Sequence, residues 1–319
     1  MSLLIQKSGI LTTVQDLGRH RFRRFGINPS GAMDPAAARL ANILVGNDDD
    51  QALIETHFPA IEIRFESDAV AAIGGADLRP QLDDQPLENW RPFAAKKGST
   101  LKFTGKITGN RSYLAVRGGI QTDRWLQSSS TNLAAKIGGI GGRKLAIGDR
   151  LSIGKASQTD SRLLGTKISK SLIPHYRPFP TVRIIAGAEY PNLSNRGRNH
   201  LLHQNFTISN NSNRMGFRLI GDPVTLSKKR EFISSAVGFG TIQTLPDGQL
   251  IVLMADHQTA GGYPRIGHVI SRDLPLLAQL GANDKVAFHL VDNEHAENLA
   301  LEFERDLNFL RVAVRRIFC

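Results

Sequence analysis

The sequence has a single cysteine among its 319 residues, and this cysteine, Cys319, is the last residue. One thiol cannot form an internal disulfide or a CxxC metal site, so we expect a reducing compartment and no metal held within this chain. No stretch approaches the roughly 18 apolar residues of a membrane-spanning helix, and the N-terminal residues lack the charged and apolar regions of a secretory signal. These absences predict a cytoplasmic protein that makes no membrane contact.

Aromatic side chains are also scarce, at 7% of the sequence, although the net charge is +11. A basic chain is a candidate for binding nucleic acid or an anionic small molecule. Here the Lys and Arg residues are mostly dispersed, and the basic runs 19–24 and 228–230 carry few aromatic side chains on which bases could stack. We therefore interpret these runs as solvated surface, and expect a small-molecule substrate and no nucleic acid.

Several motifs of nucleotide-binding and catalytic sites are missing from the sequence. The glycine-rich segments 74–77 and 138–142 match neither the Walker loop nor the GxGxxG fingerprint. No GxSxG segment is present to hold a nucleophilic serine. His200 and His203 are three residues apart, but no third ligand follows at metal spacing, so we interpret them as a structural pair. The sequence thus predicts no nucleotide site of its own.

Short apolar runs separated by turn residues fill most of the chain. Some alternate with a period of two, as in residues 61–65 (IEIRF), which is typical of strands with one buried face. A segment rich in Ser, Lys and Thr, 154–180, ends in a cluster of prolines and interrupts this pattern. A chain of 319 residues is also long enough for more than one domain. We expect two domains, at 1–160 and 181–319, joined by a linker at 161–180.

The first helix is marked clearly at its start. Asp34 is a good N-cap residue, Pro35 fits the first turn, and 36–45 (AAARLANILV) is rich in helix-forming residues. Ser30 and Met33 therefore stand just upstream of a helix N-terminus, where free amides and the helix dipole can bind an anion. The alternative is that Ser30 only helps to cap the helix, and the sequence leaves both interpretations open.

Two further helices are predicted toward the C-terminus. A short one begins with Asp273 as its N-cap and has Pro275 in its first turn. From Glu294 onward, apolar residues recur every three or four positions, which predicts an amphipathic helix packed on a barrel or on a partner. The whole pattern predicts a mainly β chain, built as sandwiches or barrels, with a few short helices and a C-terminal helix.

The run Thr241–Ile266 joins a turn, a buried strand and a polar loop end to end. Residues 246–248 (PDG) favour a reverse turn, and 250–254 (LIVLM) is short enough for a strand buried on both faces. Binding residues often lie on loops held by rigid elements, so we place the candidate site in the loop that follows. For its Gly-Gly-Tyr-Pro segment, a purely structural turn is the alternative. The candidates are Asp256, His257, Gln258, Gly261, Gly262 and Tyr263.

Taken together, several segments in one order resemble a known family. They are LTTVQDLGR at 11–19, SGAMDP at 30–35, LANILVGN at 40–47, YLAVRGGI at 113–120, GGIGGRKLAIGD at 138–149, SNRMGFRL at 212–219, and the loop at 256–266. The chain is similar to proteins variously called biotin-dependent carboxyltransferase, allophanate hydrolase subunit 2 or the C component of 5-oxoprolinase. The resemblance implies two cyclophilin-like β-barrel domains. It also implies a homologous first subunit as partner, of the type of the 5-oxoprolinase B component or allophanate hydrolase subunit 1.

The resemblance further implies a component of an ATP-dependent 5-oxoprolinase, which opens the lactam of 5-oxoproline to glutamate with an amidohydrolase component. ATP would act with the partner subunits, and this chain alone would be inactive. Arg214 is then the candidate for binding the substrate carboxylate, because Arg can do so through two hydrogen bonds. Asp256 is the candidate base or metal orienter. The polarised oxygen would be held by Gln258, Tyr263 and the amides of Gly261 and Gly262.

Departures from the family pattern accompany this resemblance. His257 stands where the family usually has Arg, so a permanent cation that would hold an anionic substrate is lost. Gly74 likewise stands where a Thr is common. We still expect Arg214 and Asp256 to converge on one pocket, together with Ser30 or Met33 from the N-terminal half.

Two other functions stay open on the sequence. One is a carboxyltransferase subunit that moves a carboxyl group from carboxybiotin to a urea-like or amide acceptor, which needs biotin on a separate protein. The other is a regulatory protein that binds the first subunit and catalyses nothing.

Overall fold

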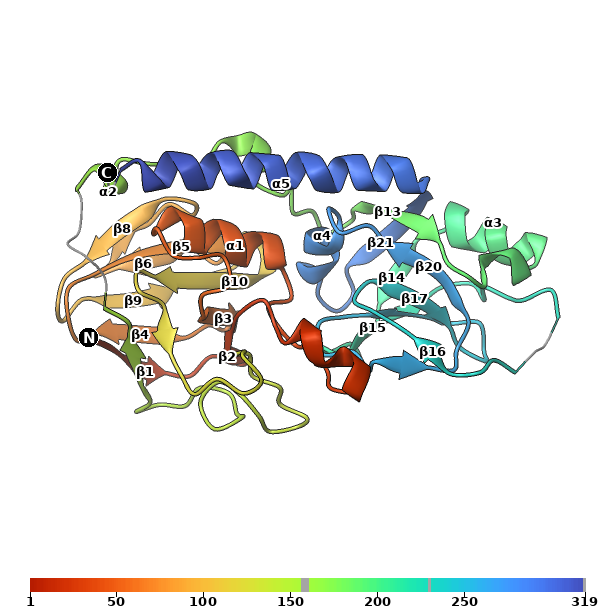
Figure 1. Cartoon of the computed structure of the whole chain (residues 1–319), viewed down its shortest axis with the longest axis horizontal. Coiled ribbons are helices and arrows are strands. Elements are labelled where there is room, and N and C mark those ends of the chain that lie inside the picture. The colour runs from red at the N-terminus through yellow and green to blue at the C-terminus, as the bar shows by residue number, and fades with distance from the viewer. Residues whose placement is uncertain (156–160, 229–230, 318–319) are drawn as a thin grey trace. The chain divides into compact units, whose positions relative to one another are not determined.

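The computed structural model describes residues 1–155, 161–228 and 231–317. Cys319 and the basic residues Lys229 and Arg230 therefore lie outside the described residues. The chain, whose elements are labelled in Figure 1, forms two compact units. Unit 1 comprises Met1–Arg19, Ser30–Pro174 and Glu304–Cys319, and unit 2 comprises His20–Pro29 and His175–Phe303.

The predicted domain boundaries stay a prediction, and the compact units divide the chain differently. Residues 20–29 belong to unit 2, where Arg23 donates a hydrogen bond to the carbonyl of Val237. The first part of the predicted linker is folded. It contains the short helices α2 (Ser161–Leu164) and η2 (Lys170–Leu172), and each of them has a buried leucine.

The strands of unit 1 form two sheets. The sheets have the orders β11-β12-β1-β4-β9-β6-β7 and β2-β3-β10-β5-β8. The strands are β1 (Ser2–Lys7), β2 (Thr12–Gln15), β3 (Leu53–His57), β4 (Glu62–Phe65), β5 (Ala69–Asp77), β6 (Pro80–Leu82), β7 (Gln85–Pro86), β8 (Pro92–Ala95), β9 (Thr100–Phe103), β10 (Thr108–Val116), β11 (Ile120–Gln121) and β12 (Arg150–Ile153).

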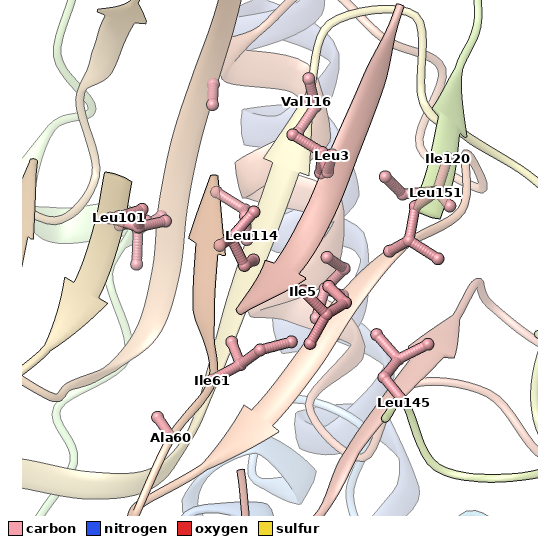
Figure 2. Packing of buried hydrophobic residues seen from close by; sticks show 14 of the residues in the cluster. Leu3, Ile5, Ala60, Ile61, Leu101, Leu114, Val116, Ile120, Leu145 and Leu151 are labelled. Carbon is pink, nitrogen blue, oxygen red and sulfur yellow. The ribbon is translucent and has the colours of Figure 1, made fainter. Parts of the chain in front are cut away.

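One hydrophobic core lies between these sheets. Leu3 and Ile5 of β1 come from the seven-stranded sheet, and Leu114 and Val116 of β10 come from the five-stranded sheet. Figure 2 shows these side chains gathered in a single cluster. The apolar residues of the alternating run 61–65 are buried in the same cluster, as the period of two predicts.

Helix α1 (Pro35–Leu44) covers the five-stranded sheet, against β5 and β10. Its predicted start is confirmed, because the Asp34 side chain accepts a hydrogen bond from the amide of Ala37 at 2.9 Å and Pro35 opens the first turn. The helix is nearly all buried, which explains why it is rich in alanine and leucine.

Unit 2 is a closed barrel of seven strands in the order β13-β20-β17-β18-β15-β14-β21. A separate two-stranded sheet pairs β16 with β19. The strands are β13 (Thr181–Ala186), β14 (Phe206–Ile208), β15 (Gly216–Ile220), β16 (Ser235–Ala236), β17 (Thr241–Thr244), β18 (Leu250–Leu253), β19 (Ala260–Gly261), β20 (Arg265–Val269) and β21 (Lys285–Leu290).

Unit 2 also contains the short helices η1 (His20–Phe25), η3 (Tyr190–Asn192), α3 (Asn195–His203) and α4 (Leu274–Ala278). The predicted helix after Asp273 is confirmed as α4, with Pro275 in its first turn. Asp273 is the N-cap residue, as predicted, but its carboxylate makes an ion pair with Arg183 and gives no capping hydrogen bond.

The predicted C-terminal helix is confirmed as α5 (Asn293–Arg315). Its residues from Glu304 onward belong to unit 1, where Leu307 and Val314 are buried and Arg311 makes an ion pair with Asp49. The expected fold class, a mainly β chain with few short helices and a C-terminal helix, is therefore confirmed. Over the stretches that the structure describes, no helix has the length and apolarity to cross a membrane.

Candidate functional site

The predicted order of turn, strand and loop is present in the barrel of unit 2. The turn 245–249 joins β17 to β18, and the amide of Leu245 donates to the carbonyl of Gln249 at 2.8 Å. Strand β18 is buried between β15 and β17, so the loop that follows it leaves the barrel from a fixed point. This explains how the sequence sets the position of residues 254–264.

Arg214 and Asp256, which are 42 residues apart in sequence, form a buried ion pair. The Arg214 Nε atom lies 2.9 Å from Asp256 Oδ2, and the Nη2 atom lies 3.1 Å from Oδ1. Their side chains are 6% and 7% exposed. The planar guanidinium therefore meets the carboxylate through two parallel hydrogen bonds.

Main-chain and side-chain hydrogen bonds add to this ion pair. The amide of Asp256 donates to the carbonyl of Arg214 at 2.8 Å, and Asn28 Nδ2 donates to the carbonyl of Asp256 at 3.0 Å. The pair therefore fixes the point where the loop begins. Because both carboxylate oxygens accept from Arg214, the geometry favours an anchoring role for Asp256, and its action as a base stays a prediction.

His257 follows directly, and its side chain is buried. Its Nδ1 atom lies 2.5 Å from the carbonyl oxygen of Gln258. Burial lowers the pKa of His257 below its ordinary value near 6.5, and the nearby positive charge of Arg23 lowers it further. The imidazole is therefore mostly neutral at pH 7, so position 257 supplies no permanent cation for an anionic substrate.

A pocket of about 490 Å³ opens on the outer face of the barrel; we call it the barrel-face pocket. Two of the predicted catalytic residues, Gln258 and Tyr263, line it. Its other lining residues are Asn211, Asn213, Met215, Gly216, Arg218, Gln243, Leu245, Pro246, Asp247 and Ile251. Arg214 and Asp256 are not among the lining residues, so the structure brings them to each other but not to this pocket.

Three of the lining residues form a row across adjacent strands. Arg218 on β15 lies opposite Ile251 on β18, and Ile251 lies opposite Gln243 on β17. Residues directly opposite each other in a sheet point to the same side. Arg218, Ile251 and Gln243 therefore share the outer face, with the apolar Ile251 between a cation and an amide.

A second pocket, of about 720 Å³, lies beside the first; we call it the hairpin pocket. The two pockets share the turn residues Leu245, Pro246 and Asp247, and they share Tyr263, which is 46% exposed. Gly262 lines the hairpin pocket, whereas Gly261 pairs with Ser235 in the two-stranded sheet. Tyr263 thus forms a wall common to both pockets.

Ser30 and Met33 belong to unit 1, whereas the other predicted site residues belong to unit 2. Ser30 Oγ accepts a hydrogen bond from Asn132 Nδ2 at 3.0 Å, and the amide of Met33 donates to Glu55 Oε2 at 2.8 Å. These contacts fix the turn before α1 within unit 1. The convergence of Ser30 or Met33 with Arg214 and Asp256 stays a prediction.

Buried hydrogen bonds also stabilise the turn before α1. The Tyr113 hydroxyl donates to Glu55 Oε2 at 2.8 Å and accepts from the amide of Asp34 at 2.8 Å. Burial raises the pKa of Tyr113 well above its ordinary value near 10, and the adjacent carboxylate charge of Glu55 raises it further. The hydroxyl therefore stays protonated and able to donate.

Two pocket residues, Arg218 and Gln243, were not predicted as site residues. Arg218 stands in the same matched segment as Arg214, and alternation could not have separated them, because Arg214 precedes β15 and lies an even number of residues from Arg218. Gln243 is a lone amide in the buried strand TIQT, a weak signal without the register of β17. Among the residues that the structure describes, no three His, Cys, Asp or Glu side chains gather as a metal site would require.

The comparisons with known proteins identify the family of this chain. Residues 25–290 match the carboxyltransferase domain, subdomains A and B. The chain belongs to the carboxyltransferase domain family. The family resemblance expected from the sequence is therefore confirmed.

Relatives of two kinds share this family. The C component of the Haemophilus influenzae 5-oxoprolinase is 36% identical over 299 residues, covering 94% of this chain and 94% of the relative. The Escherichia coli protein of the same name is 39% identical over 287 residues, covering 90% of each. Urea amidolyase of Saccharomyces cerevisiae is 31% identical over 310 residues, covering 91% of this chain but 17% of the yeast protein.

Solved structures match the fold over nearly the whole chain. The crystal structure of the Kluyveromyces lactis urea amidolyase has a TM-score of 0.89 at 25% identity and covers 97% of this chain and 20% of that one. The Kluyveromyces lactis urea carboxylase structure has the same TM-score and identity and covers 29% of that chain. This chain thus spans less than a third of these larger enzymes, but about the full length of its two bacterial 5-oxoprolinase relatives.

Proposed function

We propose that this chain is the C component of an ATP-dependent 5-oxoprolinase, which converts 5-oxoproline to glutamate with a homologous first subunit and an amidohydrolase component. The observation that carries this proposal is the match, over 94% and 90% of both chains and at 36% and 39% identity, with two relatives named as this component of 5-oxoprolinase. The urea amidolyase, by contrast, is matched over 17% of its length. We place the assembly in the cytoplasm.

The role that the reaction leaves to this chain is to position the substrate. A lactam is stabilised by resonance, and phosphorylation of its oxygen by ATP makes it a better electrophile. The chain's own residues would bind the ring and hold its orientation, which lowers the barrier by fixing the reacting groups. Gln258 and Tyr263 can bond polar groups of the ring, and the Arg214–Asp256 ion pair keeps their loop in place. Arg218, which lines the pocket, is better placed than the buried Arg214 to bind a carboxylate.

The glycine-rich segment 138–142 lacks a nucleotide-binding motif, and its glycines have a packing role. A Cβ atom on Gly138 would lie 2.0 Å from the carbonyl oxygen of Ser130, and one on Gly142 would lie 2.0 Å from the carbonyl carbon of Lys136. Gly138 and Gly142 therefore serve close packing of the chain on itself. We assign ATP to the partner subunits and no step of its chemistry to this chain.

The test is reconstitution of the assembly. The chain is co-purified with the products of its neighbouring genes, and ATP-dependent release of glutamate from 5-oxoproline is measured. Glutamate release that needs this chain and ATP supports the proposal. A complete assembly that releases none would overturn it, as would full activity without this chain. Calorimetry with ATP and the isolated chain is expected to give no micromolar binding.

Carboxyl transfer is the second candidate function. The family description and the TM-score of 0.89 with the urea amidolyase and urea carboxylase structures favour it. The pocket amides of Asn213 and Gln258 suit the ureido group of a biotin carried by another protein. Addition of a biotin carboxylase and a biotinylated carrier separates the two functions. Consumption of carboxybiotin with urea or an amide acceptor, without glutamate release, would favour transfer.

A further inference from the structure

Gln243 has an unmatched hydrogen-bonding atom. Its side chain is fully buried, and its Nε2 atom donates to the carbonyl of Tyr263 at 3.1 Å. Its Oε1 atom is buried and has no hydrogen-bond partner among the residues that the structure describes. Nearly all buried polar atoms in proteins are paired, so an unpaired acceptor in the wall of a pocket indicates a donor that comes from outside the chain.

The row of Arg218, Ile251 and Gln243 across the sheet indicates what kind of ligand carries this donor. Arg218 and Gln243 are two strands apart, and because strands are about 4.8 Å apart, their backbones are separated by roughly 10 Å. Ile251 provides an apolar floor between them. No side-chain partner holds the Arg218 guanidinium within the described stretches of the chain, and the residue is exposed. The space therefore suits a small ligand with an anionic group and an N–H group.

We propose that the barrel-face pocket is the subsite for the carboxylate-bearing lactam, with its N–H donating to Gln243 Oε1 and its carboxylate bound by Arg218. The identity of the ligand as 5-oxoproline rests on the proposed function. In 5-oxoproline the ring nitrogen and the carboxylate are attached to the same carbon, so the two contacts require the long Arg218 side chain to extend over Ile251 toward Gln243. An arginine can bind a carboxylate through two hydrogen bonds in this position.

The covering loop takes part in this binding. Gly261 lies against Gln243, since a Cβ atom there would be 2.9 Å from Gln243 Nε2. The Oε1 atom is shielded from solvent, so the proposal requires the loop 258–263 to move outward for the ligand to reach it. The hydrogen bond from Gln243 to the carbonyl of Tyr263 ties the same side-chain amide to this loop.

A pair of ligands tests the N–H contact. They are 5-oxoproline and its lactone analogue, in which a ring oxygen replaces the N–H group, and calorimetry measures the binding of each to the full chain and to the reconstituted complex. The wild-type protein should bind the lactam on the order of tenfold more tightly than the lactone, because the lactone leaves the acceptor unpaired. Gln243→Met should abolish this preference, and Arg218→Gln should weaken both ligands and keep the ratio.

Gln249→Met is the matched control. Gln249 lies in the same hairpin, bonds both the amide and the carbonyl of Gly221, and does not line the pocket. It should keep the lactam preference. Equal binding of the lactam and the lactone by the wild-type protein would overturn the subsite, and this result does not depend on whether Gln243→Met folds. The subsite would also be overturned if neither ligand binds to the chain or to the complex. A preference that persists in Gln243→Met would also overturn it.

The outcomes separate this subsite from the proposed function. Glutamate release by the complex without a lactam preference at Gln243 leaves the function standing and removes the subsite. A preference that depends on Gln243, in a complex that releases no glutamate, leaves the subsite standing and removes the function.

Discussion

Removal of one partner of the Arg214–Asp256 ion pair should destabilise unit 2 strongly. Both side chains are almost fully buried, and each carboxylate oxygen accepts one hydrogen bond from the guanidinium. Arg214→Met leaves a buried carboxylate without its cation, and the loss for such a broken pair is about 3–5 kcal/mol in the free energy of unfolding. Asp256→Asn keeps the shape but removes the negative charge that faces the guanidinium, so its loss should be similar.

The double variant tests more directly whether the two residues stabilise the protein through one interaction. If the two losses come from one interaction, Arg214→Met with Asp256→Asn should lose about 2–3 kcal/mol less than the sum of the single losses. Arg214→Lys should fall between wild type and Arg214→Met, because a point charge cannot make the two parallel hydrogen bonds. In the reconstituted complex, Asp256→Asn should lower turnover more than it weakens substrate binding if the carboxylate also transfers a proton.

The assay is urea unfolding followed by two signals. The sequence has two tryptophans, Trp90 and Trp125, and both lie in unit 1, so their fluorescence reports on unit 1. Far-ultraviolet circular dichroism reports on both units, and comparison of the signals identifies the unit that loses stability. A loss below about 1 kcal/mol for Arg214→Met, or additive losses in the double variant, would refute the view that the pair anchors the loop.

Other side chains give independent tests. Tyr113→Phe should lower the free energy of unfolding by about 1–3 kcal/mol, measured by urea unfolding, because Glu55 loses a buried donor; an unchanged midpoint would contradict this network. Leu307→Ala should cost about 2–5 kcal/mol because the side chain is fully buried, whereas Leu301→Ala on the same helix, 68% exposed, is the control and should cost almost nothing. The lowered pKa of His257 means that the unfolded chain takes up a proton there before the folded chain does. Stability should therefore fall as the pH drops below about 6.5, and His257→Gln should show a smaller fall between pH 7.5 and 5.5; an equal fall would contradict the assignment.

The alternation of polar and apolar residues made much of the fold predictable. Residues 61–65 alternate in sequence and are buried alternately in the core of unit 1. The N-cap at Asp34 and the apolar spacing of α5 are likewise local features of the sequence. Helices α1 and α5 could therefore be predicted from the sequence alone. The pairing of residues 20–29 with the second unit could not be predicted, because it depends on long-range contacts such as the one from Arg23 to Val237.

The candidate site was predictable as a loop but not as a pocket. The turn and the buried strand β18 identify where the polar loop must leave the barrel. Which side chains face the pocket depends on register, since neighbouring residues of a strand point to opposite faces. Arg218 and Gln243 lie on the two strands that flank β18, each opposite Ile251, and no motif in the sequence shows this arrangement.

The two glycines of the loop show how structural and functional roles combine. Sequence alone treats Gly261 and Gly262 as equivalent sources of backbone freedom. In the structure, a Cβ atom on Gly261 would lie 2.9 Å from Gln243 Nε2, whereas one on Gly262 would meet no atom nearer than 3.4 Å among the described neighbours. Gly261 thus allows the close approach of the loop to the pocket amide, and a side chain there would make the Gln243 amide shift from the position in which it holds Tyr263. The amide that packs against this glycine is therefore the same one that, in our proposal, accepts the substrate N–H.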